Sequence, residues 1–342
     1  MAMSTTAERI GAVSPRLPEH AGIAVWRPAT TDDVTALTAL MQAADRVDHP
    51  SWLTPREDVD EMFESSWIDP ESDTLVGLDD EGDLVAVGCV SFHPSRDERL
   101  QVHLQGRVHP RVRRRGIGNE VLRWERERAR AALVAVDSPL PAAITFYADE
   151  PDVGSRHLAE ACGMRVERWF TSMDRSLADA IGEPEMVAEA GSIDVVNYDA
   201  SWRDATLTAR NDAFRDHWGS LPTPHERWVQ FVEGPFLRPD LSWLAVEGDR
   251  VVGLALGTVN EEDWEPQGYS SVYIDLIGVT RDRRGRRIAP ALIARLLRSA
   301  RDAGLDKAVL DVDTENPSGA LGLYERLGFV PTERSLALVE RL

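Results

Sequence analysis

The chain has 342 residues, of which 43% are hydrophobic, so it is long enough for two domains with proper cores. Its formal net charge of −20 argues against a nucleic-acid ligand, which favours a basic surface. No apolar run is long enough to cross a membrane, no signal-peptide pattern occurs, and Cys89 and Cys162 are expected to be buried thiols of an intracellular protein. We therefore expect a cytoplasmic protein with no membrane partner and, lacking zinc-type Cys/His spacing, no metal.

The first half opens with residues 1–21, which are small, polar and proline-containing and are expected to form a flexible tail. Apolar periodicity then predicts both strands and helices over residues 22–177. In chain order they are strand Gly22–Arg27, helices Thr30–Arg46 and Thr54–Ser65, strands Thr74–Leu78, Leu84–Phe92 and Gln101–Val108, helix Gly118–Leu133, strand Ala142–Ala148, helix Val153–Ala161 and a hairpin-like pair within Met164–Leu177.

Residues 178–191 contain Gly, Pro and acidic residues and are expected to be a linker. Residues 192–342 then predict the same order of elements again, so we expect two domains of one mixed α/β fold, each with a mostly antiparallel sheet flanked by helices. The elements are strand Ile193–Tyr198, helices Ser201–His217 and Pro224–Glu233, strands Trp243–Val246, Val251–Val259 and Ser271–Val279, helix Ala289–Ala303, strand Ala308–Asp313, helix Gly319–Leu327 and closing strands to Leu342.

A basic loop with small residues occurs twice, starting at Val108 and at Val279, 171 residues apart. Each copy follows a predicted strand and opens a predicted helix, whose free N–H groups and positive dipole end favour an anion. A single loop of this kind is more often a solvated surface, but two copies in one context favour a phosphate site. The candidate binding residues are Val108, Arg113, Arg114, Gly116, Ile117 and Gly118 in the first copy and Val279, Arg284, Gly285, Arg286, Arg287, Ile288 and Ala289 in the second.

The loop pattern and the stretch Thr314–Phe329, which contains Asn316, Tyr324 and Leu-Gly-Phe, resemble the GNAT superfamily of acetyl-coenzyme A-dependent N-acetyltransferases. The resemblance covers both halves and is stronger in the second. The tandem layout and the stretch Asn211–Gly219 also resemble the mycothiol synthase group of actinobacterial double-GNAT proteins. The resemblance implies acetyl-coenzyme A as cosubstrate and a small-molecule amine as acceptor, in a monomer or a homodimer.

The resemblance also assigns roles to residues of the second half. It implies Tyr324 as the general acid that protonates the departing thiolate, although a tyrosine at this spacing could also be a core residue. It implies a strand N–H near Ile277 that polarises the acetyl carbonyl, and Asn316 beside the cofactor. Asp275 stands where many members have a Glu base, with a loop-holding role equally open. The resemblance also implies a bulge in this strand, which would separate it from the next strand.

Two further residues, His217 and Trp218, end the predicted first helix of the second half, where family members form the acceptor pocket. A histidine at a helix end is also favoured by the helix dipole alone, so the structural interpretation of His217 stays open beside the functional one.

The two halves differ at the positions that the chemistry needs. By the 171-residue offset and the motif, Leu104 takes the place of Asp275 and Ala159 takes the place of Tyr324. The first domain is therefore expected to be degenerate and non-catalytic, and the second to be catalytic. The second loop departs from the family at Arg287, where Gly is usual; a helical conformation there would accept Arg, whereas a close backbone approach would weaken coenzyme A binding.

The sequence thus favours transfer of an acetyl group to a primary amine by direct attack, with Tyr324 as acid and Asp275 as possible base. A non-enzymatic acyl-coenzyme A-binding or scaffold protein and a transferase for another acyl group are the alternatives. The acceptor itself is not encoded in these motifs, because a fold does not fix a substrate.

Overall fold

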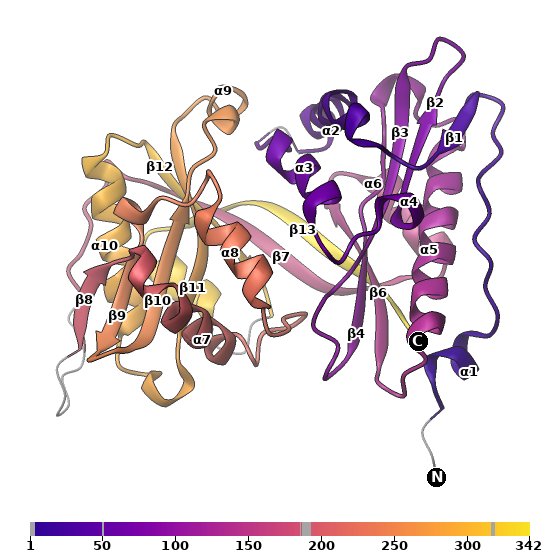
Figure 1. Ribbon diagram of the computed structural model, residues 1–342. Helices are drawn as coiled ribbons and strands as arrows, with labels where there is room; N and C mark the ends of the chain where they lie inside the picture. Colours follow the sequence, from indigo (N-terminus) through magenta and orange to yellow (C-terminus); the bar gives the residue numbers. More distant parts are fainter. Residues whose placement is uncertain (1–3, 50, 185, 187–192, 316–318) are drawn as a thin grey trace. The chain divides into compact units, whose positions relative to one another are not determined.

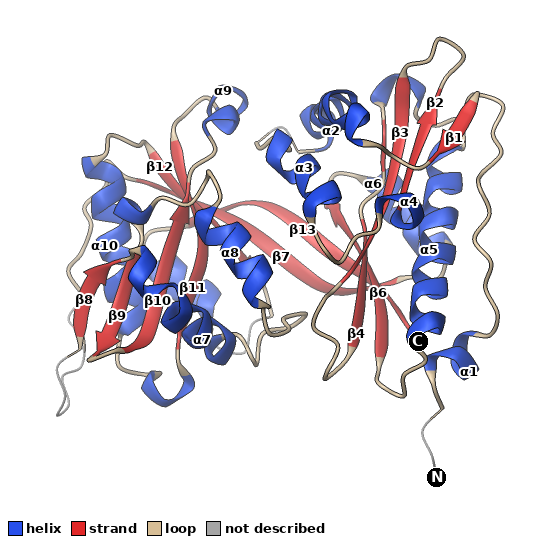
Figure 2. Cartoon of the chain, viewed as in Figure 1, coloured by secondary structure: helices blue, strands red, loops and turns tan. Residues whose placement is uncertain are grey.

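The computed structural model describes residues 4–49, 51–184, 186, 193–315 and 319–342 (Figures 1 and 2). The chain forms two compact units, of which the first contains residues 1–168 and 335–342 and the second contains residues 169–334. Each unit is a mixed sheet with helices packed on its faces. Among the described residues, no helix combines the length and the apolar character needed to cross a membrane.

The first unit is built around a sheet of order β1-β2-β3-β4-β6-β13, in which only the β4–β6 pair is parallel. Helices α2 and α3 pack on one face through apolar residues such as Leu37 and Val59, and α5 packs through residues such as Ile117. The elements are α1 (Thr6–Ile10), β1 (Val25–Arg27), α2 (Val34–Asp48), α3 (Arg56–Glu64), α4 (Pro70–Asp73), β2 (Thr74–Leu78), β3 (Leu84–Phe92), β4 (Leu100–Leu104), β5 (Arg107–Val108), α5 (Ile117–Val136), β6 (Ala142–Asp149), α6 (Val153–Ala161) and the end of β13 (Val330–Arg341).

The second unit repeats this plan with the order β7-β12-β11-β10-β9-β8, and here only the β11–β12 pair is parallel. The apolar stripe of α10, including Leu292 and Leu296, forms one core, and residues of α7 and α8, such as Trp228, form another. The elements are β7 (Arg165–Ser176), β8 (Asp194–Asn197), α7 (Arg203–Ala213), α8 (His225–Glu233), β9 (Trp243–Glu247), β10 (Arg250–Thr258), α9 (Trp264–Gln267), β11 (Ser271–Val279), α10 (Ile288–Asp302), β12 (Lys307–Asp313) and α11 (Ala320–Arg326).

The closing strand of each half differs from expectation. Residues 165–176 form one continuous strand where a hairpin-like pair was predicted, and residues 330–341 likewise form one strand. β7 pairs with β12, and β13 pairs with β6, so each closing strand completes the sheet built mainly by the other half of the sequence. The compact units therefore do not follow the expected boundaries of 22–177 and 192–342, which assume that each half keeps its own last strand.

The N-terminal segment also differs from the expected loose tail. Residues 6–10 form α1, whose N-terminus carries a capping box made by Thr5 and Glu8. The buried Thr6 hydroxyl donates to the carbonyl oxygen of Leu133 (2.7 Å), which ties the segment to α5. Of the two free cysteines, Cys89 is buried as expected, whereas Cys162 is only partly buried because it lies at the end of α6.

Candidate functional site

The two central strands of the second unit separate partway along their length. β11 and β12 are paired from Ser271–Lys307 to Tyr273–Val309 and no further. On its other side β11 pairs with β10, and the register of this pair shifts. Leu276 lies opposite Leu256, and Ile274 lies opposite the next residue, Gly257. Asp275 is therefore the extra residue of a bulge. A bulge bends its strand, so it accounts for the separation, and the bulge expected in this strand is present.

The separation exposes backbone groups of β11. The Thr280 N–H donates to the Val252 oxygen (3.0 Å), which identifies a hydrogen-bonded position of the β10–β11 ladder. Because hydrogen-bonded and non-bonded positions alternate in an antiparallel pair, Ile277 and Val279 direct their N–H groups away from β10, toward the side where β12 has separated. Ile277, predicted to supply an N–H donor, therefore presents one to the opened edge.

A cavity of about 760 Å³ lies along this edge. Asp275 and Ile277 of β11, Asp311 of β12 and Tyr324 of α11 line one part of it. The residues Val279, Arg284, Gly285, Arg286, Arg287, Ile288 and Ala289, all predicted from the basic loop, line the other. The structure thus gathers the predicted catalytic and cofactor residues of the second half around one cavity; Asn316 lies outside the described residues.

The loop that opens α10 contains two left-handed positions, Gly285 (φ 79°) and Arg287 (φ 59°). Successive backbone N–H groups in such a turn converge, and together with the N-terminus of α10 they form a concave site suited to an anion. The helical conformation considered for Arg287 is not the observed one, because the residue is left-handed. A side chain there costs about 1 kcal/mol relative to glycine but keeps a cation beside the cavity.

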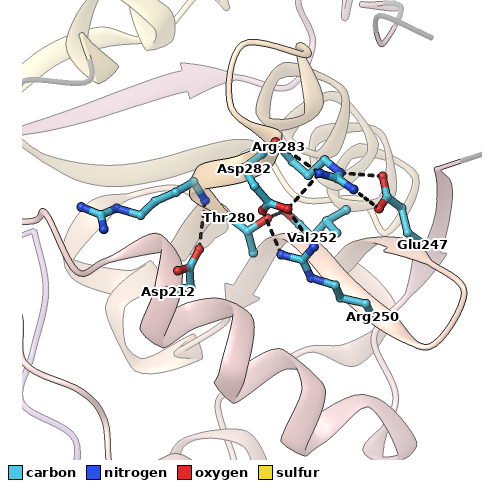
Figure 3. A network of polar contacts seen from close by, with 8 residues as sticks. Asp212, Glu247, Arg250, Val252, Thr280, Asp282 and Arg283 are labelled. Carbon is cyan, nitrogen blue, oxygen red and sulfur yellow. Dashed lines mark hydrogen bonds and ion pairs between the residues drawn. The ribbon is translucent and has the colours of Figure 1, made fainter. Parts of the chain in front are cut away.

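Ion pairs fix the start of this loop to its surroundings (Figure 3). Arg250 contacts Asp282 with two bonds of 2.8 Å, and Arg283 contacts Glu247 with two bonds of 2.7 Å. The Arg281 backbone N–H donates to Asp212 at the end of α7 (2.9 Å). Hydrogen bonds from Arg250 hold the pKa of Asp282 well below its usual range, so this carboxylate is ionised.

Arg284, predicted to contact phosphate, lies on the cavity but is already engaged. Its guanidinium donates to the Ala213 oxygen (2.8 Å) and contacts Asp216 (3.2 Å). Arg113 of the first loop is held in the same manner by Asp48, with contacts of 2.6 and 2.8 Å, and by the Val108 oxygen. Both arginines fasten the end of a helix to the loop, which leaves the backbone N–H groups as the principal anion donors.

Asp275 shares the cavity with a second carboxylate, Asp311. The Asp275 side chain is open to the cavity, but surrounding protein removes part of its hydration, and this desolvation together with the Asp311 charge raises its pKa to about 6. Asp311 accepts hydrogen bonds from the hydroxyl groups of Tyr273 (3.0 Å) and Ser172. Asp311 was not among the residues predicted from the sequence, because only the register of β11 and β12 brings it toward Asp275.

Tyr324 lies at the inner wall of the cavity and is 8% exposed. Its ring packs edge-on against Phe329 at 6.0 Å, which fixes the side chain, and burial raises its pKa to about 12. The hydroxyl is therefore protonated at neutral pH. Within the described part of the chain it makes no hydrogen bond, so the proton is free for a bound molecule.

His217 and Trp218 do not end the first helix of the second half, because α7 ends at Ala213. His217 lies in the segment that follows, lines the cavity and packs against Phe214 at 5.7 Å. Trp218 does not line this cavity and packs against Phe170 at 6.1 Å. The helix prediction was wrong by four residues, since the helical turn at Phe214 is followed by irregular structure.

The first unit holds a related cavity of about 820 Å³, lined by the six candidate residues of its loop, Val108, Arg113, Arg114, Gly116, Ile117 and Gly118. This loop also has two left-handed positions, Arg114 (φ 65°) and Gly116 (φ 96°). Of the two left-handed positions, glycine therefore occupies the second in the first loop and the first in the second loop. Ala159 takes the place of Tyr324, because each accepts the same pair of backbone hydrogen bonds that end its helix.

The strand register corrects the expected counterpart of Asp275. β3 pairs with β4 and β5 without a shift, from Phe92–Val102 to Ala86–Val108. The first unit therefore lacks the inserted residue, and Leu104 corresponds to Ile274. Leu104 also remains paired with Phe146 of β6, so the central strands of this unit stay together further than β11 and β12 do.

One acidic group among the described residues, formed by Asp79, Glu81 and Asp83, has carboxylates close enough to hold a cation. Arg111 already contacts Asp79 (2.9 Å) and Asp83 (2.8 Å), so two of the three charges are compensated within the protein.

Comparison with known proteins gives a consistent picture. Residues 203–329 match the model of the acetyltransferase (GNAT) family, and residues 25–165 match a model described as an acetyltransferase (GNAT) domain. A mycothiol acetyltransferase of Parafrankia sp. is 28% identical to this chain, in an alignment that covers 87% of this chain and 91% of the relative. A mycothiol acetyltransferase of Thermomonospora curvata is 31% identical over 65% of this chain and 68% of its own.

Solved structures resemble most of the chain. A GCN5-related N-acetyltransferase from Sphaerobacter thermophilus has a TM-score of 0.68 and 24% identity, with 93% of this chain and 95% of that one covered. A tandem GNAT protein from the clavulanic acid biosynthesis pathway has a TM-score of 0.66 and 18% identity, with 93% and 98% covered. At these identities the structures show a shared fold.

Proposed function

Because the chain belongs to the GNAT acetyltransferase family and is an acetyl-coenzyme A-dependent acyltransferase, we propose that its second unit transfers acetyl to a primary amine of a small molecule. The observation that carries the proposal is the single cavity in which Asp275, Ile277, Tyr324 and the basic loop meet. The family membership favours an enzyme over a non-enzymatic binding or scaffold protein.

The residues of this cavity fit acetyl-coenzyme A. The left-handed turn at Gly285 and Arg287 and the N-terminus of α10 suit its pyrophosphate, and the outward N–H groups of Ile277 and Val279 suit its amide-bearing arm. When bound, acetyl-coenzyme A supplies the thioester whose acetyl carbon is attacked. The N–H of Ile277 is placed on the edge where it would donate to the acetyl oxygen.

The side chains at the other end of the cavity suit the proton transfers. In the reaction a nitrogen–carbon bond forms, the carbon–sulfur bond breaks, and the amine loses a proton while sulfur gains one. Asp275, with a pKa near 6, is ionised at neutral pH and would accept the amine proton directly or through water. Tyr324, protonated and without a hydrogen-bond partner among the described residues, would donate to sulfur.

Asp311 supports an amine as the acceptor. Two carboxylates face the same end of the cavity, and their negative charge favours a group that arrives as an ammonium ion. His217 lines the cavity and remains a candidate acceptor contact, whereas Trp218 would act only by packing on its neighbours. The first unit, with Ala159 in place of the tyrosine, would support the fold or bind a ligand without transfer.

The proposal is tested by measuring thiol release from acetyl-coenzyme A in the presence of glucosamine, a primary amine that has no thiol of its own. We expect amine-dependent release by the wild type and a decrease of about 10²-fold or more in turnover for Tyr324→Phe, because the general acid is lost. Calorimetry should show nearly unchanged acetyl-coenzyme A affinity for this variant. Tyr269→Phe, which removes a hydroxyl outside the cavity of the second unit, is the matched control. Equal turnover in Tyr324→Phe and wild type would remove Tyr324 from its role.

A further inference from the structure

A carboxyl group lies where the core of the first unit should be apolar. Glu125 on α5 is 1% exposed, and it stands eight residues after Ile117, the first residue of the helix. The residue at the same place in α10, eight after Ile288, is Leu296, which is fully buried among apolar side chains. A buried glutamate in place of leucine is costly unless its oxygens have partners.

One oxygen of Glu125 has two partners in the sheet. Oε1 accepts hydrogen bonds from the backbone N–H groups of Cys89 (3.2 Å) and Gln105 (3.1 Å). The Cys89 N–H would otherwise continue the ladder between β3 and the strand formed by β4 and β5. The glutamate therefore binds at the point where β4 ends and β5 has not yet begun.

Two glycines make room for this carboxyl group. A Cβ at Gly106 would lie 2.9 Å from Oε2 of Glu125, and a Cβ at Gly88 would lie 3.2 Å from its Cγ. Both contacts are tighter than a Cβ normally makes, so a side chain at either position would force Glu125 or its neighbour Val121 to shift. The sequence is thus adapted to hold the carboxyl group at this place.

The other oxygen, Oε2, has no hydrogen-bond partner within the part of the chain that the structure describes. Glu125 lines the cavity of about 820 Å³ whose other wall is the basic loop with Arg114 and Gly116. Gly106 lies beside it on the same wall. The His109 N–H donates to the Val85 oxygen (2.9 Å), so His109 is a hydrogen-bonded position of the ladder with β3. Hydrogen-bonded and non-bonded positions alternate, so the N–H of Gly106, three residues earlier, points away from β3. The N–H of Ile277 points away from β10 in the same way.

The protonation of Glu125 follows from these surroundings. Burial raises its pKa to about 8, although the two backbone donors and the charge of Arg107 act in the opposite direction. The group is therefore mainly a neutral acid at pH 7. Since Oε1 already accepts two N–H groups, the proton belongs on Oε2, where it requires an acceptor.

We propose that Glu125 donates this hydrogen bond to a carbonyl oxygen on the arm of a phosphate-ended ligand bound in the first cavity. The basic loop and the N-terminus of α5 hold the phosphate end, and the N–H of Gly106 offers a second donor beside Glu125. Glu125 thereby sets the specificity of a binding site that is separate from transfer in the second unit. Binding at this site is linked to one proton.

Other ionisable groups surround this position and need a control. Arg107 on β5 interacts electrostatically with Glu125, and Glu125 and Asp73 of α4 both interact with the Cys89 thiol on β3. His49, at the end of α2, lines the same cavity as Tyr147 and Asp149; its Nε2 lies 3.2 Å from Asp45. Variants that differ only at Glu125 keep all of these groups, so a pH effect that arises from their titration would appear in every variant.

The test uses acetyl-coenzyme A as the probe and full-length protein that carries Ala289→Glu. This substitution places a carboxylate in the second loop to prevent binding there, so calorimetry reports binding in the first cavity. Three forms are titrated at pH 6.5 and pH 9: with Glu125 intact, with Glu125→Gln and with Glu125→Leu. Gln keeps an acceptor and a donor but cannot ionise. Arg114→Glu, which reverses the charge in the first loop, verifies the location.

We expect the intact form to bind about tenfold more weakly at pH 9 than at pH 6.5, beyond any change in Glu125→Gln, because the donor is lost on ionisation. Glu125→Leu should bind about fivefold to tenfold more weakly than the intact form at pH 6.5, as expected for one lost hydrogen bond. Absence of binding, or equal pH dependence in the intact and Gln forms, would overturn the proposal even if Leu prevents folding. Because only binding is read, this failure is distinct from failure of acetyl transfer.

Discussion

At the scale of single residues, the reaction proposed for the second unit depends on how two carboxylates share one cavity. Asp275 is the extra residue of the bulge in β11, and Asp311 lies on β12, where hydroxyl groups of Tyr273 and Ser172 hold it. Desolvation and the neighbouring charge both disfavour ionisation of Asp275, so its pKa rises to about 6. A carboxylate with this pKa suits the proposed base, close to neutral pH and without a histidine.

The pH dependence of transfer should report this arrangement. Because the base must be ionised, kcat/KM should fall about tenfold per pH unit below about pH 6. Asp311→Asn removes the neighbouring charge, so the acidic limb should move toward the ordinary aspartate pKa near 4. Asp275→Asn should lower kcat by about 10²-fold and abolish the limb. A limb that persists in Asp275→Asn would assign the titration to another group.

The residues that the sequence revealed are those with a fixed position in a motif. Tyr324, Asp275 and the two loops were predicted in this way, and Ile277 was predicted from the resemblance of its strand to the family; all of them line the two cavities. Asp311 and Glu125 were missed, because their neighbours are fixed by strand register and by packing of a helix on a sheet. For Glu125 one signal was available: a single acidic residue in the otherwise apolar stripe of α5.

At the scale of elements, the two basic loops have similar backbone conformations and differ in which left-handed position is a glycine. The first has Arg114 and Gly116 at its left-handed positions, and the second has Gly285 and Arg287. Both loops are also anchored by an ion pair at the same position, but with the charges reversed. Arg111 contacts Asp79 and Asp83 in the first loop, and the equivalent residue of the second loop, Asp282, contacts Arg250. The conformation is therefore a property of the connection between strand and helix and not of one glycine pattern.

This shared conformation predicts a stability difference. Arg287→Gly should raise the free energy of unfolding by up to about 1 kcal/mol, because the strain of a left-handed arginine exceeds the added freedom of the unfolded chain. Arg286→Gly, at the adjacent position without positive φ, should lower it. Thermal unfolding of both variants provides the measurement. A decrease in both variants would mean that the conformation at Arg287 is unstrained.

At the scale of the whole molecule, the order of the sequence and the order of the sheets differ. The last residues of the chain, 335–342, belong to the first unit, where Leu336 and Leu338 are fully buried and Glu340 contacts Arg126 and Arg130. The repeat in the sequence correctly indicated two copies of one fold. It did not show which copy each closing strand joins, because strand pairing depends on contacts far apart in the sequence.

Removal of residues 335–342 should therefore unfold the first unit although the deletion is at the far end of the chain. Each buried leucine contributes about 1.5–3 kcal/mol, and the total is a large part of the 5–15 kcal/mol that stabilises a domain. Hydrogen exchange should show lost protection in β6 and α5. The substitution Arg341→Ala, at an exposed position of the same strand, is the mild control. Retained protection in β6 after the deletion would contradict the observed pairing.

The most direct test of the account compares acetyl transfer in proteins altered in one loop at a time. Ala289→Glu places a negative charge at the start of α10, and Arg114→Glu places one in the loop before α5. Thiol release with a primary amine should fall at least 10²-fold in the first variant and stay within about twofold of wild type in the second, because the proposed function assigns transfer to the second unit. Loss of transfer in Arg114→Glu with retention in Ala289→Glu would place the reaction in the first unit and contradict the account.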